Sequence, residues 1–373
     1  MPDLHFLIKP ASGLCNLRCR YCFYAREVEK REEQAERFMS REIAEHLLEE
    51  AFRTVGRGRR IDFSFQGGEP TLAGLPFFRY FVEKAREECP KGVQLSFSIQ
   101  TNGLLLDEEW VSFLKKERFL TGISLDGNRE THDFCRVDHE GKGTWKKALE
   151  KAKLLLRSGV DTNVLCVVTK NCARHPQAVY NELKKNGFRY LQFIACMEED
   201  KTETPYPWSL GEEDYGKFLC TLFDLWYQDW EKGDYHSIRL FDDYIHILLH
   251  DGASTCSTCG TCGEYLVAEA DGSLYPCDFY CLDEWKIGNI MQEPLEDILN
   301  GEKYADFFAL GLEKPAVCGT CPYNAFCAGG CKNDWAPGEN GKRNIRCGAF
   351  KALFQHALPR MMTIARAERA AMR

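Results

Sequence analysis

Three cysteines near the amino end have a spacing that suits an iron–sulfur cluster. Cys15, Cys19 and Cys22 form a C-x3-C-x2-C pattern, and no fourth cysteine follows nearby. Four thiolates usually hold a [4Fe–4S] cluster, so three would leave one iron with an open coordination position. An open position separates a reactive metal site from a closed structural one. The alternatives are a zinc site or three unrelated thiols, but zinc motifs usually pair two C-x2-C units or add histidines.

The composition describes a globular protein with an unusual number of cysteines. A chain of 373 residues predicts one large domain plus a smaller one. The net charge of −8 argues against nucleic acid as a partner, and no apolar stretch is long enough to suggest membrane attachment. The amino end lacks the pattern of a secretory signal. Nineteen cysteines favour cluster ligation over disulfides, so we expect a cytoplasmic protein from an anaerobic setting.

Short β-branched or aromatic runs alternate with amphipathic segments over the first two thirds of the chain. The predicted strands are His5–Lys9, Ile61–Gln66, Gln94–Thr101, Thr121–Asp126, Thr162–Thr169 and Tyr190–Cys196. The predicted helices are Ser40–Val55, Pro76–Cys89, Asp107–Glu117, Thr144–Ser158, Pro176–Asn186 and Gly211–Glu231. Alternation of this kind implies a parallel sheet.

Six such units predict an α/β fold, a partial (β/α)6 TIM barrel spanning residues 1–235. In barrels, chemistry is found at the carboxyl ends of the strands. The cysteine loop follows the first predicted strand, Gln66-Gly67-Gly68-Glu69-Pro70 ends the second, and Ser124 lies at the end of the fourth. After about residue 250 cysteines, glycines and turn residues become dense, and helical periodicity returns only from Phe350. We therefore predict a second, cluster-binding domain over residues 236–373, closed by a C-terminal helix.

The cysteine triad together with Gly67-Gly68-Glu69-Pro70 resembles the radical S-adenosylmethionine enzymes. Two glycines after a strand let a ligand approach the backbone closely, although alone they indicate an ordinary turn. The resemblance implies that the open iron binds the amino and carboxylate groups of S-adenosylmethionine, and that reductive cleavage releases a 5′-deoxyadenosyl radical. The cofactor-binding positions that it implies are Tyr21, Gly68, Ser124, Arg136 and Met197. Without the resemblance, Ser124 reads as a strand-end hydroxyl, Arg136 as a solvated charge and Met197 as a core residue.

A second cysteine set resembles the SPASM extension, which holds two further [4Fe–4S] clusters. The pattern is Cys318-x2-Cys321-x5-Cys327-x3-Cys331, followed by Cys347. The resemblance implies that one auxiliary cluster is held by Cys256, Cys262, Cys277 and Cys331, and the other by Cys318, Cys321, Cys327 and Cys347. Both would be closed by protein ligands and would carry electrons. A zinc ribbon is the alternative for the C-x2-C pair.

Several cysteines are left over from these three sets. Spacing alone does not decide which two of Cys256, Cys259 and Cys262 are ligands, although the resemblance favours the outer pair. Cys281 is a spare near the same cluster. Cys166 and Cys196 lie in strand patterns and are expected to be small buried hydrophobes.

Narrower blocks resemble the anaerobic sulfatase-maturating enzymes over essentially the whole chain. They include Leu7-Ile8-Lys9-Pro10, the stretch from Gln66 to Gly74, and Tyr275-Pro276-Cys277-Asp278-Phe279-Tyr280. The resemblance implies that a cysteine or serine in a C/S-x-P/A-x-R segment of a sulfatase is oxidised to Cα-formylglycine. The adenosyl radical would remove a hydrogen atom from Cβ, and the remaining electron would leave through the auxiliary clusters. A flavodoxin or ferredoxin would supply electrons.

Asp278 is the candidate general base, because a carboxylate beside a cluster pocket can accept the thiol or hydroxyl proton. Its alternative is a turn aspartate that accepts backbone hydrogen bonds. The acidic segment Glu198-Glu199-Asp200 departs from the family pattern and puts substrate contacts in doubt. Three other functions stay open: a maturase that forms thioether crosslinks in a ribosomal peptide, a non-catalytic electron carrier, and a zinc-binding interaction module.

Overall fold

The structure of the chain, a computed structural model, describes residues 3–31, 38–197, 206–263, 265–338 and 341–372. The acidic segment at 198–200 lies outside these residues. Tertiary contacts divide the chain into two compact units. The first comprises residues 1–124, 136–162 and 263–308, and the second comprises residues 125–135, 163–262 and 309–373. These units are defined by tertiary contacts, whereas the predicted domains are defined by the clusters that they would bind. The expected boundary after residue 235 therefore stays a prediction.

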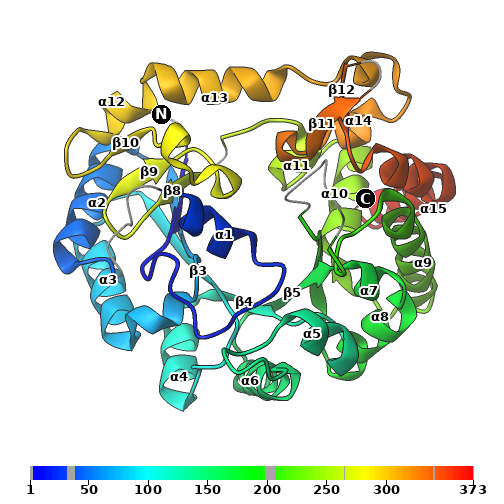
Figure 1. Cartoon of the computed structure of the whole chain (residues 1–373), viewed down its shortest axis with the longest axis horizontal. Helices are drawn as coiled ribbons and strands as arrows, with labels where there is room; N and C mark the ends of the chain where they lie inside the picture. The colour runs from blue at the N-terminus through cyan, green and yellow to red at the C-terminus, as the bar shows by residue number, and fades with distance from the viewer. Residues whose placement is uncertain (1–2, 32–37, 198–205, 264, 339–340, 373) are drawn as a thin grey trace. The chain divides into compact units, whose positions relative to one another are not determined.

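The first unit combines parallel strands with the helices that cover them (Figure 1). Its strands are β1 (Leu4–Ile8), β2 (Arg60–Phe65), β3 (Gln94–Thr101), β4 (Leu120–Ser124), β8 (Leu266–Ala268), β9 (Ser273–Tyr275) and β10 (Gly288–Asn289). Its helices are α1 (Phe23–Lys30), α2 (Arg41–Thr54), α3 (Leu75–Glu88), α4 (Glu108–Lys116), α6 (Trp145–Ser158) and α12 (Leu295–Leu299). Helix α13 (Glu302–Leu312) begins in this unit.

Strands β1 to β4 pair in parallel, as the alternation predicts. Their inward side chains form an aromatic core in which Phe63 stacks on Phe6, with ring centroids 5.9 Å apart. Two of these helices begin after a capping side chain: Ser40 Oγ accepts from Ile43 N at 3.2 Å, and Asp107 Oδ1 accepts from Trp110 N at 2.9 Å. These contacts fix where helices α2 and α4 begin.

The cysteine-rich segment contributes strands to the first unit, which the sequence analysis did not predict. Strand β8 pairs in parallel with β1, and β9 and β10 continue the sheet in antiparallel fashion. The expectation that helical periodicity returns only at residue 350 is wrong, since α12 and α13 lie before it. Helix α13 is held by aromatic packing: the ring centroid of Phe307 lies 5.2 Å from that of Tyr280 and 5.3 Å from that of Trp285.

The second unit contains a shorter parallel arrangement and a long C-terminal helix. Its strands are β5 (Thr162–Val168), β6 (Tyr190–Ala195), β7 (Ser237–Ile238), β11 (Trp335–Gly338) and β12 (Gly341–Asn344). Its helices are α5 (Arg129–Cys135), α7 (Lys170–Ala173), α8 (Pro176–Lys185), α9 (Glu212–Glu231), α10 (Arg239–Leu249), α11 (Cys256–Cys259), α14 (Asn324–Cys327) and α15 (Cys347–Ala371). Strands β5, β6 and β7 pair in parallel, and α15 packs against α9 and α10.

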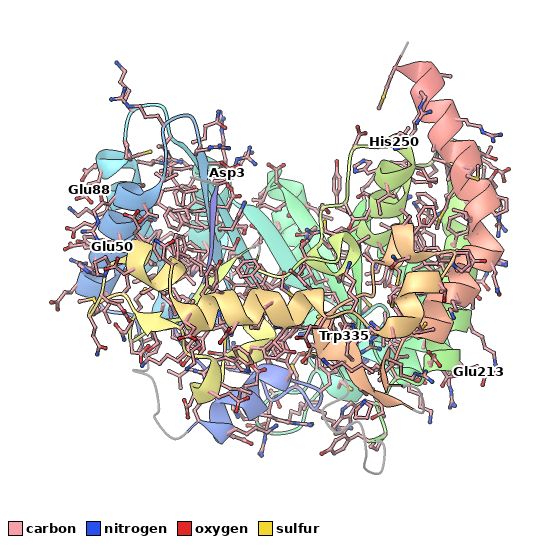
Figure 2. All side chains as sticks on the ribbon, turned by 90° about the horizontal axis from the view of Figure 1, so that it is seen from above. Asp3, Glu50, Glu88, Glu213, His250 and Trp335 are labelled. Carbon is pink, nitrogen blue, oxygen red and sulfur yellow. The ribbon has the colours of Figure 1, made fainter. Side chains whose placement is uncertain are left out.

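The α/β class is confirmed, and each predicted strand and helix lies within two residues of an observed one. Figure 2 shows the orientation of the first unit: Asp3 marks the amino end of β1, and helix α1 lies toward the opposite end of the strands. The cysteine loop that precedes α1 is therefore at the carboxyl end of β1, as predicted. Among the described helices, none has the length and apolar character needed to cross a membrane.

Candidate active site

The glycine motif after β2 is fastened to the loop that carries the first cysteines. Gly68 N donates to Ser12 O at 2.8 Å, and Glu69 N donates to Leu14 O at 2.7 Å. A Cβ atom on Gly68 would lie 2.1 Å from Leu14 O. Glycine is therefore required at this position by the approach of the cysteine loop itself, in addition to any approach of a ligand.

Glu69 is a structural carboxylate at the centre of these loops. Its side chain is 1% exposed and accepts hydrogen bonds from Thr71 Oγ1 at 2.6 Å, Thr101 Oγ1 at 2.7 Å and Asn102 N at 2.8 Å. Burial raises the pKa of Glu69, and the hydrogen bonds from Thr71, Asn102 and Thr101 oppose that rise. The carboxylate ties the loop after β2 to the loop after β3, a role that the sequence analysis did not identify.

The three cysteines of the first set lie on one partly buried loop. Cys22 directly precedes the first residue of helix α1, and Leu17 N donates to Cys15 Sγ at 3.4 Å. Burial raises the pKa of the Cys15 thiol to about 11, so the thiolate needs a metal to form at neutral pH. Three thiols on one loop are a donor set that fits an iron–sulfur cluster with one open iron.

Four of the five predicted cofactor-binding residues belong to the first unit: Tyr21, Gly68, Ser124 and Arg136. The guanidinium of Arg136 lies 5.4 Å from the ring centroid of Tyr21, and its side chain is buried rather than solvated. Ser124 Oγ accepts from Gln100 Nε2 at 3.0 Å. Met197 follows β6 in the second unit. The roles of these five residues stay predictions.

Asp278 is held by two side chains that the sequence analysis did not assign. Lys9 Nζ lies 2.5 Å from Asp278 Oδ1, and Gln66 Nε2 donates to Asp278 Oδ2 at 3.0 Å. Both Lys9 and Asp278 are buried, and Lys9 Nζ lies 3.2 Å from the ring centroid of Tyr24. Burial disfavours the charged form of Lys9, but the opposing charge of Asp278 holds the pKa of Lys9 well above its usual value.

A further group of buried charges surrounds this pair. Arg31 Nη1 lies 2.9 Å from Glu269 Oε1, and the hydroxyl of Tyr24 donates to the same carboxylate. Glu27 is also buried, and its Oε2 has no hydrogen-bond partner among the described residues. Burial, reinforced by the nearby charge of Asp278, raises the pKa of Glu27 to about 8. Glu27 is therefore mostly protonated at neutral pH.

One of the two auxiliary cysteine sets is brought together inside the second unit. A single pocket is lined by Cys318, Cys321, Cys327 and Cys347, with Tyr323, Phe350 and Phe354 among the other residues of its wall. Burial, followed by the proximity of the other cysteines, raises the pKa of Cys318. Four converging sulfurs with apolar neighbours fit a closed [4Fe–4S] cluster, and the ligand role itself stays a prediction.

The other auxiliary set is divided between the units: Cys256, Cys262 and Cys331 belong to the second, and Cys277 belongs to the first. Cys259 is exposed, and its Sγ donates to Ala253 O at 3.2 Å, whereas Cys256 and Cys262 are partly buried. This difference agrees with the outer pair as ligands.

The remaining cysteines are mainly packing residues. Cys281 is fully buried and packs with Tyr24, Val267 and Tyr275. Cys166 and Cys196 are buried, as predicted. The Sγ atom of Cys166 lies 3.9 Å from that of Cys172, which is also buried.

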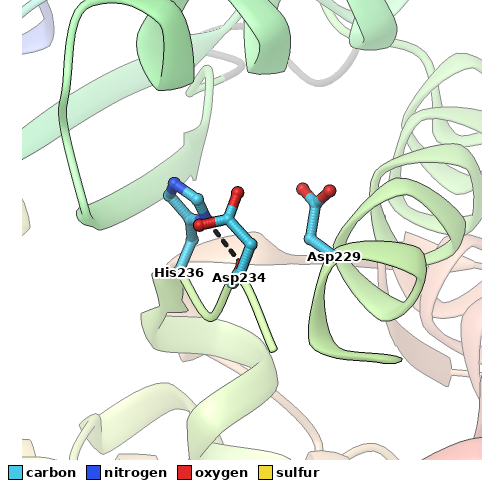
Figure 3. Close-up of side chains that lie close together, drawn as sticks. All are labelled: Asp229, Asp234 and His236. Atoms are coloured by element: carbon cyan, nitrogen blue, oxygen red, sulfur yellow. Dashed lines mark hydrogen bonds between the residues drawn. The ribbon is translucent and has the colours of Figure 1, made fainter. Parts of the chain in front are cut away.

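Asp229, Asp234 and His236 also lie close together in the second unit (Figure 3). His236 Nδ1 lies 3.0 Å from Asp234 O, and that ring nitrogen is therefore engaged by the backbone. Lys184 pairs with Asp229, and Arg189 Nη1 lies 2.8 Å from Asp234 Oδ1. Because cations already balance both carboxylates, this group reads as a structural ion-pair network rather than a metal site.

Comparison with known proteins gives two family matches. The radical SAM superfamily matches residues 10–183, and a family described as an iron-sulfur cluster-binding domain matches residues 256–322. A cysteine-type anaerobic sulfatase-maturating enzyme of Clostridium novyi is 40% identical over 98% of both chains. A serine-type anaerobic sulfatase-maturating enzyme of Bacteroides thetaiotaomicron is 30% identical over 96% of this chain and 90% of the relative.

The solved structures agree with these relatives. Native anSMEcpe with bound AdoMet and Cp18Cys peptide matches with a TM-score of 0.92 and 39% identity, over 98% of this chain and 99% of that one. SuiB of Streptococcus suis bound to precursor peptide SuiA matches with a TM-score of 0.60 and 17% identity, covering 89% of this chain and 72% of that chain, which shows the fold alone. The chain thus has a radical SAM core followed by a SPASM region, and it belongs to the family of anaerobic sulfatase-maturating enzymes.

Proposed function

We propose that this protein oxidises the active-site cysteine of a sulfatase to Cα-formylglycine. The observation that carries the proposal is the near full-length relation to sulfatase-maturating enzymes. Cysteine is favoured over serine because the cysteine-type relatives are 39 to 40% identical, against 30 to 32% for the serine-type ones. The substrate segment would be C-x-P/A-x-R.

In this proposal the cofactors occupy the cysteine sets described above. Cys15, Cys19 and Cys22 would hold the cluster that binds S-adenosylmethionine, with Tyr21, Gly68, Ser124, Arg136 and Met197 as contacts of the bound cofactor. When bound, S-adenosylmethionine supplies the adenosyl radical that removes a hydrogen atom from the substrate Cβ. The two auxiliary sets would hold [4Fe–4S] clusters that supply an acceptor for the second electron, and a flavodoxin or ferredoxin would be the external donor.

Asp278 would take the proton of the substrate thiol. The ion pair with Lys9 and the hydrogen bond from Gln66 support this role, because they fix both carboxylate oxygens and leave their remaining lone pairs as acceptors. Loss of a hydrogen atom from Cβ, a proton from sulfur and one electron leaves a thioaldehyde. Water then releases hydrogen sulfide and leaves the aldehyde of formylglycine.

The test is a peptide assay under anaerobic conditions. The reconstituted protein is incubated with a C-x-P-x-R peptide, S-adenosylmethionine and reductant, and the peptide mass is followed. For the cysteine peptide we expect the loss of mass that corresponds to conversion of the thiol to an aldehyde. The serine counterpart should lose two hydrogens, without a crosslink, at a lower rate. Unchanged mass on both peptides, with all clusters intact, would reject the proposal.

The same assay distinguishes the rival functions. A thioether-forming maturase would produce a loss of two hydrogens and a crosslink within the peptide. An electron carrier would leave S-adenosylmethionine uncleaved after reduction, and metal analysis would identify a zinc module. We also infer a cytoplasmic location, since thiol-bound clusters require a reducing compartment.

A further inference from the structure

Asn102, in the loop after β3, has a side chain that is fixed at both ends. It is 7% exposed, its Oδ1 accepts from Leu104 N at 3.0 Å, and its Nδ2 donates to Asn16 Oδ1 at 2.7 Å. Because a backbone N–H can only donate, the oxygen of the amide must face Leu104. The NH2 group therefore faces the cysteine loop.

The main chain of Asn102 is anchored as firmly as its side chain. Its backbone N–H donates to Glu69 Oε2 at 2.8 Å, while Glu69 Oε1 accepts from Thr71 and Thr101. These contacts all lie inside the first unit. The glycine motif thus positions Asn102 relative to the cysteine loop.

The NH2 group of Asn102 reaches the sulfur of a predicted cluster ligand. Asn102 Nδ2 lies 3.9 Å from Cys15 Sγ, and Leu17 N donates to the same sulfur at 3.4 Å. A donor at a ligand sulfur stabilises the state of a cluster that carries more negative charge, which is the reduced state. Hydrogen bonds to the sulfurs are one of the factors that set cluster reduction potentials.

We infer that Asn102 is a positioning residue that raises the reduction potential of the cluster at Cys15, Cys19 and Cys22 by donating its amide to Cys15 Sγ. The inference rests on the proposed function, since it requires a cluster at this loop. It assigns the stretch Thr101-Asn102-Gly103 an electronic role, in addition to closing strand β3. Asn16 Oδ1 accepts from the same NH2 group at 2.7 Å, and this shorter contact limits how closely the nitrogen can approach Cys15 Sγ.

The test is a redox titration of the anaerobic holoenzyme followed by electron paramagnetic resonance. The signal that changes on addition of S-adenosylmethionine reports the cluster at Cys15. In Asn102→Leu we expect the equilibrium constant for one-electron reduction to fall about tenfold, which corresponds to a potential ~59 mV more negative. Asn102→Asp keeps the acceptor for Leu104 N but replaces the donor with a negative charge, so its fall should be at least as large.

A variant that is expected to raise the reduction potential distinguishes a specific effect of the hydrogen bond from a general loss of structure. In Asn16→Ala the acceptor that holds the NH2 group at 2.7 Å is lost, and the amide can approach Cys15 Sγ more closely, so we expect the potential to rise. Leu105→Ala, on the same loop with a side chain 41% exposed, is the matched control and should leave the potential unchanged. Iron and sulfide are counted in every variant.

The outcomes separate the inference from the function on which it rests. Unchanged potentials in both Asn102 variants, with full cluster content, would overturn the inference and leave the proposed function standing. A fall in potential in Asn16→Ala would also count against it. A wild-type protein without a cluster that responds to S-adenosylmethionine would instead reject the proposed function.

Discussion

The two cysteine sites that lie within single units differ in what surrounds their sulfurs. The loop of Cys15, Cys19 and Cys22 is bordered by polar groups, including the amide of Asn102 and the backbone N–H of Leu17. The wall of the pocket of Cys318, Cys321, Cys327 and Cys347 includes the rings of Tyr323, Phe350 and Phe354, and the surface that it exposes is almost entirely apolar. Three thiols with polar neighbours suit a site that must bind and change a ligand. Four thiols in an apolar pocket suit a site that only exchanges electrons.

The largest effect is expected from removing the first set of cysteines. The Cys15/Cys19/Cys22 triple alanine variant should lose one cluster and all turnover, and should no longer cleave S-adenosylmethionine, because no open iron remains. Iron and sulfide counts and chromatography of the nucleoside product measure both effects. Cleavage that persists in this variant would place the reactive site elsewhere.

Removing the second set should separate radical formation from product formation. A Cys318→Ala/Cys321→Ala variant should lose one auxiliary cluster while retaining S-adenosylmethionine cleavage, and peptide oxidation should fall at least about tenfold, as happens when groups that support a metal centre are lost. The ratio of cleaved cofactor to oxidised peptide is the measurement. If that ratio stays at the wild-type value, the second pocket has no part in the oxidation.

Glycine substitutions test the two sites at matched positions. Gly68→Ala should prevent the cysteine loop from closing, since its Cβ would lie 2.1 Å from Leu14 O, and activity should fall at least about tenfold as overpacking forces the backbone apart. Gly319→Ala, between two cysteines of the second site, has no atom within 4 Å of the added Cβ. Gly319→Ala should keep normal cluster content, whereas equal damage in both variants would show that crowding at Gly68 is not the cause.

Buried charge near the first site can be measured with a double-mutant cycle. Lys9→Met leaves the Asp278 carboxylate buried without its cation, which should cost roughly 3–5 kcal/mol of stability. The Lys9→Met/Asp278→Asn double variant should recover much of that loss while remaining inactive. Anaerobic chemical denaturation gives the stabilities. A Lys9→Met protein as stable as wild type would show that the ion pair contributes little.

The smallest expected effect concerns Glu27. Its pKa in the folded protein, raised to about 8 by burial, exceeds the value of about 4.3 in an unfolded chain. The unfolded state therefore releases this proton first, and stability is lost as pH rises from about 4.3 to about 8. Glu27→Gln removes that pH dependence. The free energy of unfolding of the variant, relative to that of wild type, should therefore increase by up to a few kcal/mol between pH 5 and pH 8. Thermal unfolding at the two pH values measures it, and parallel curves would contradict the raised pKa.

Much of the first two thirds of the fold could be predicted, because the spacing of apolar residues and the capping residues indicate the same helices and strands there. Strand β3 and helix α4, for example, follow directly from the apolar alternation and from Asp107 as a cap. The strands β8 and β9 were missed because they are only three residues each. Asp271-Gly272 between two apolar runs was the available hairpin signal, and it was obscured by the density of cysteines around it.

Site residues could be predicted where their own type and spacing indicate the chemistry. They could not be predicted where their role depends on which residues lie beside them in the fold. Cysteine spacing indicates a cluster by itself, and the four cysteines of the second pocket indeed converge. The roles of Lys9, Gln66 and Asn102 depend on which loops meet, and no sequence pattern specifies that. A lysine directly after the apolar run Leu7-Ile8 was the one available hint, since charged side chains are seldom buried without a partner.

Strand β1 acquires its two neighbours at very different times during synthesis. Strand β2 follows at residues 60–65, whereas β8 is completed only at residue 268. Until then, one edge of β1 carries unpaired backbone groups of the kind that promote aggregation, and the Glu269 partner of Arg31 is missing. A nascent or truncated chain that ends before β8 therefore has an incomplete sheet and an uncompensated arginine. The first strand depends on the last third of the chain to finish folding.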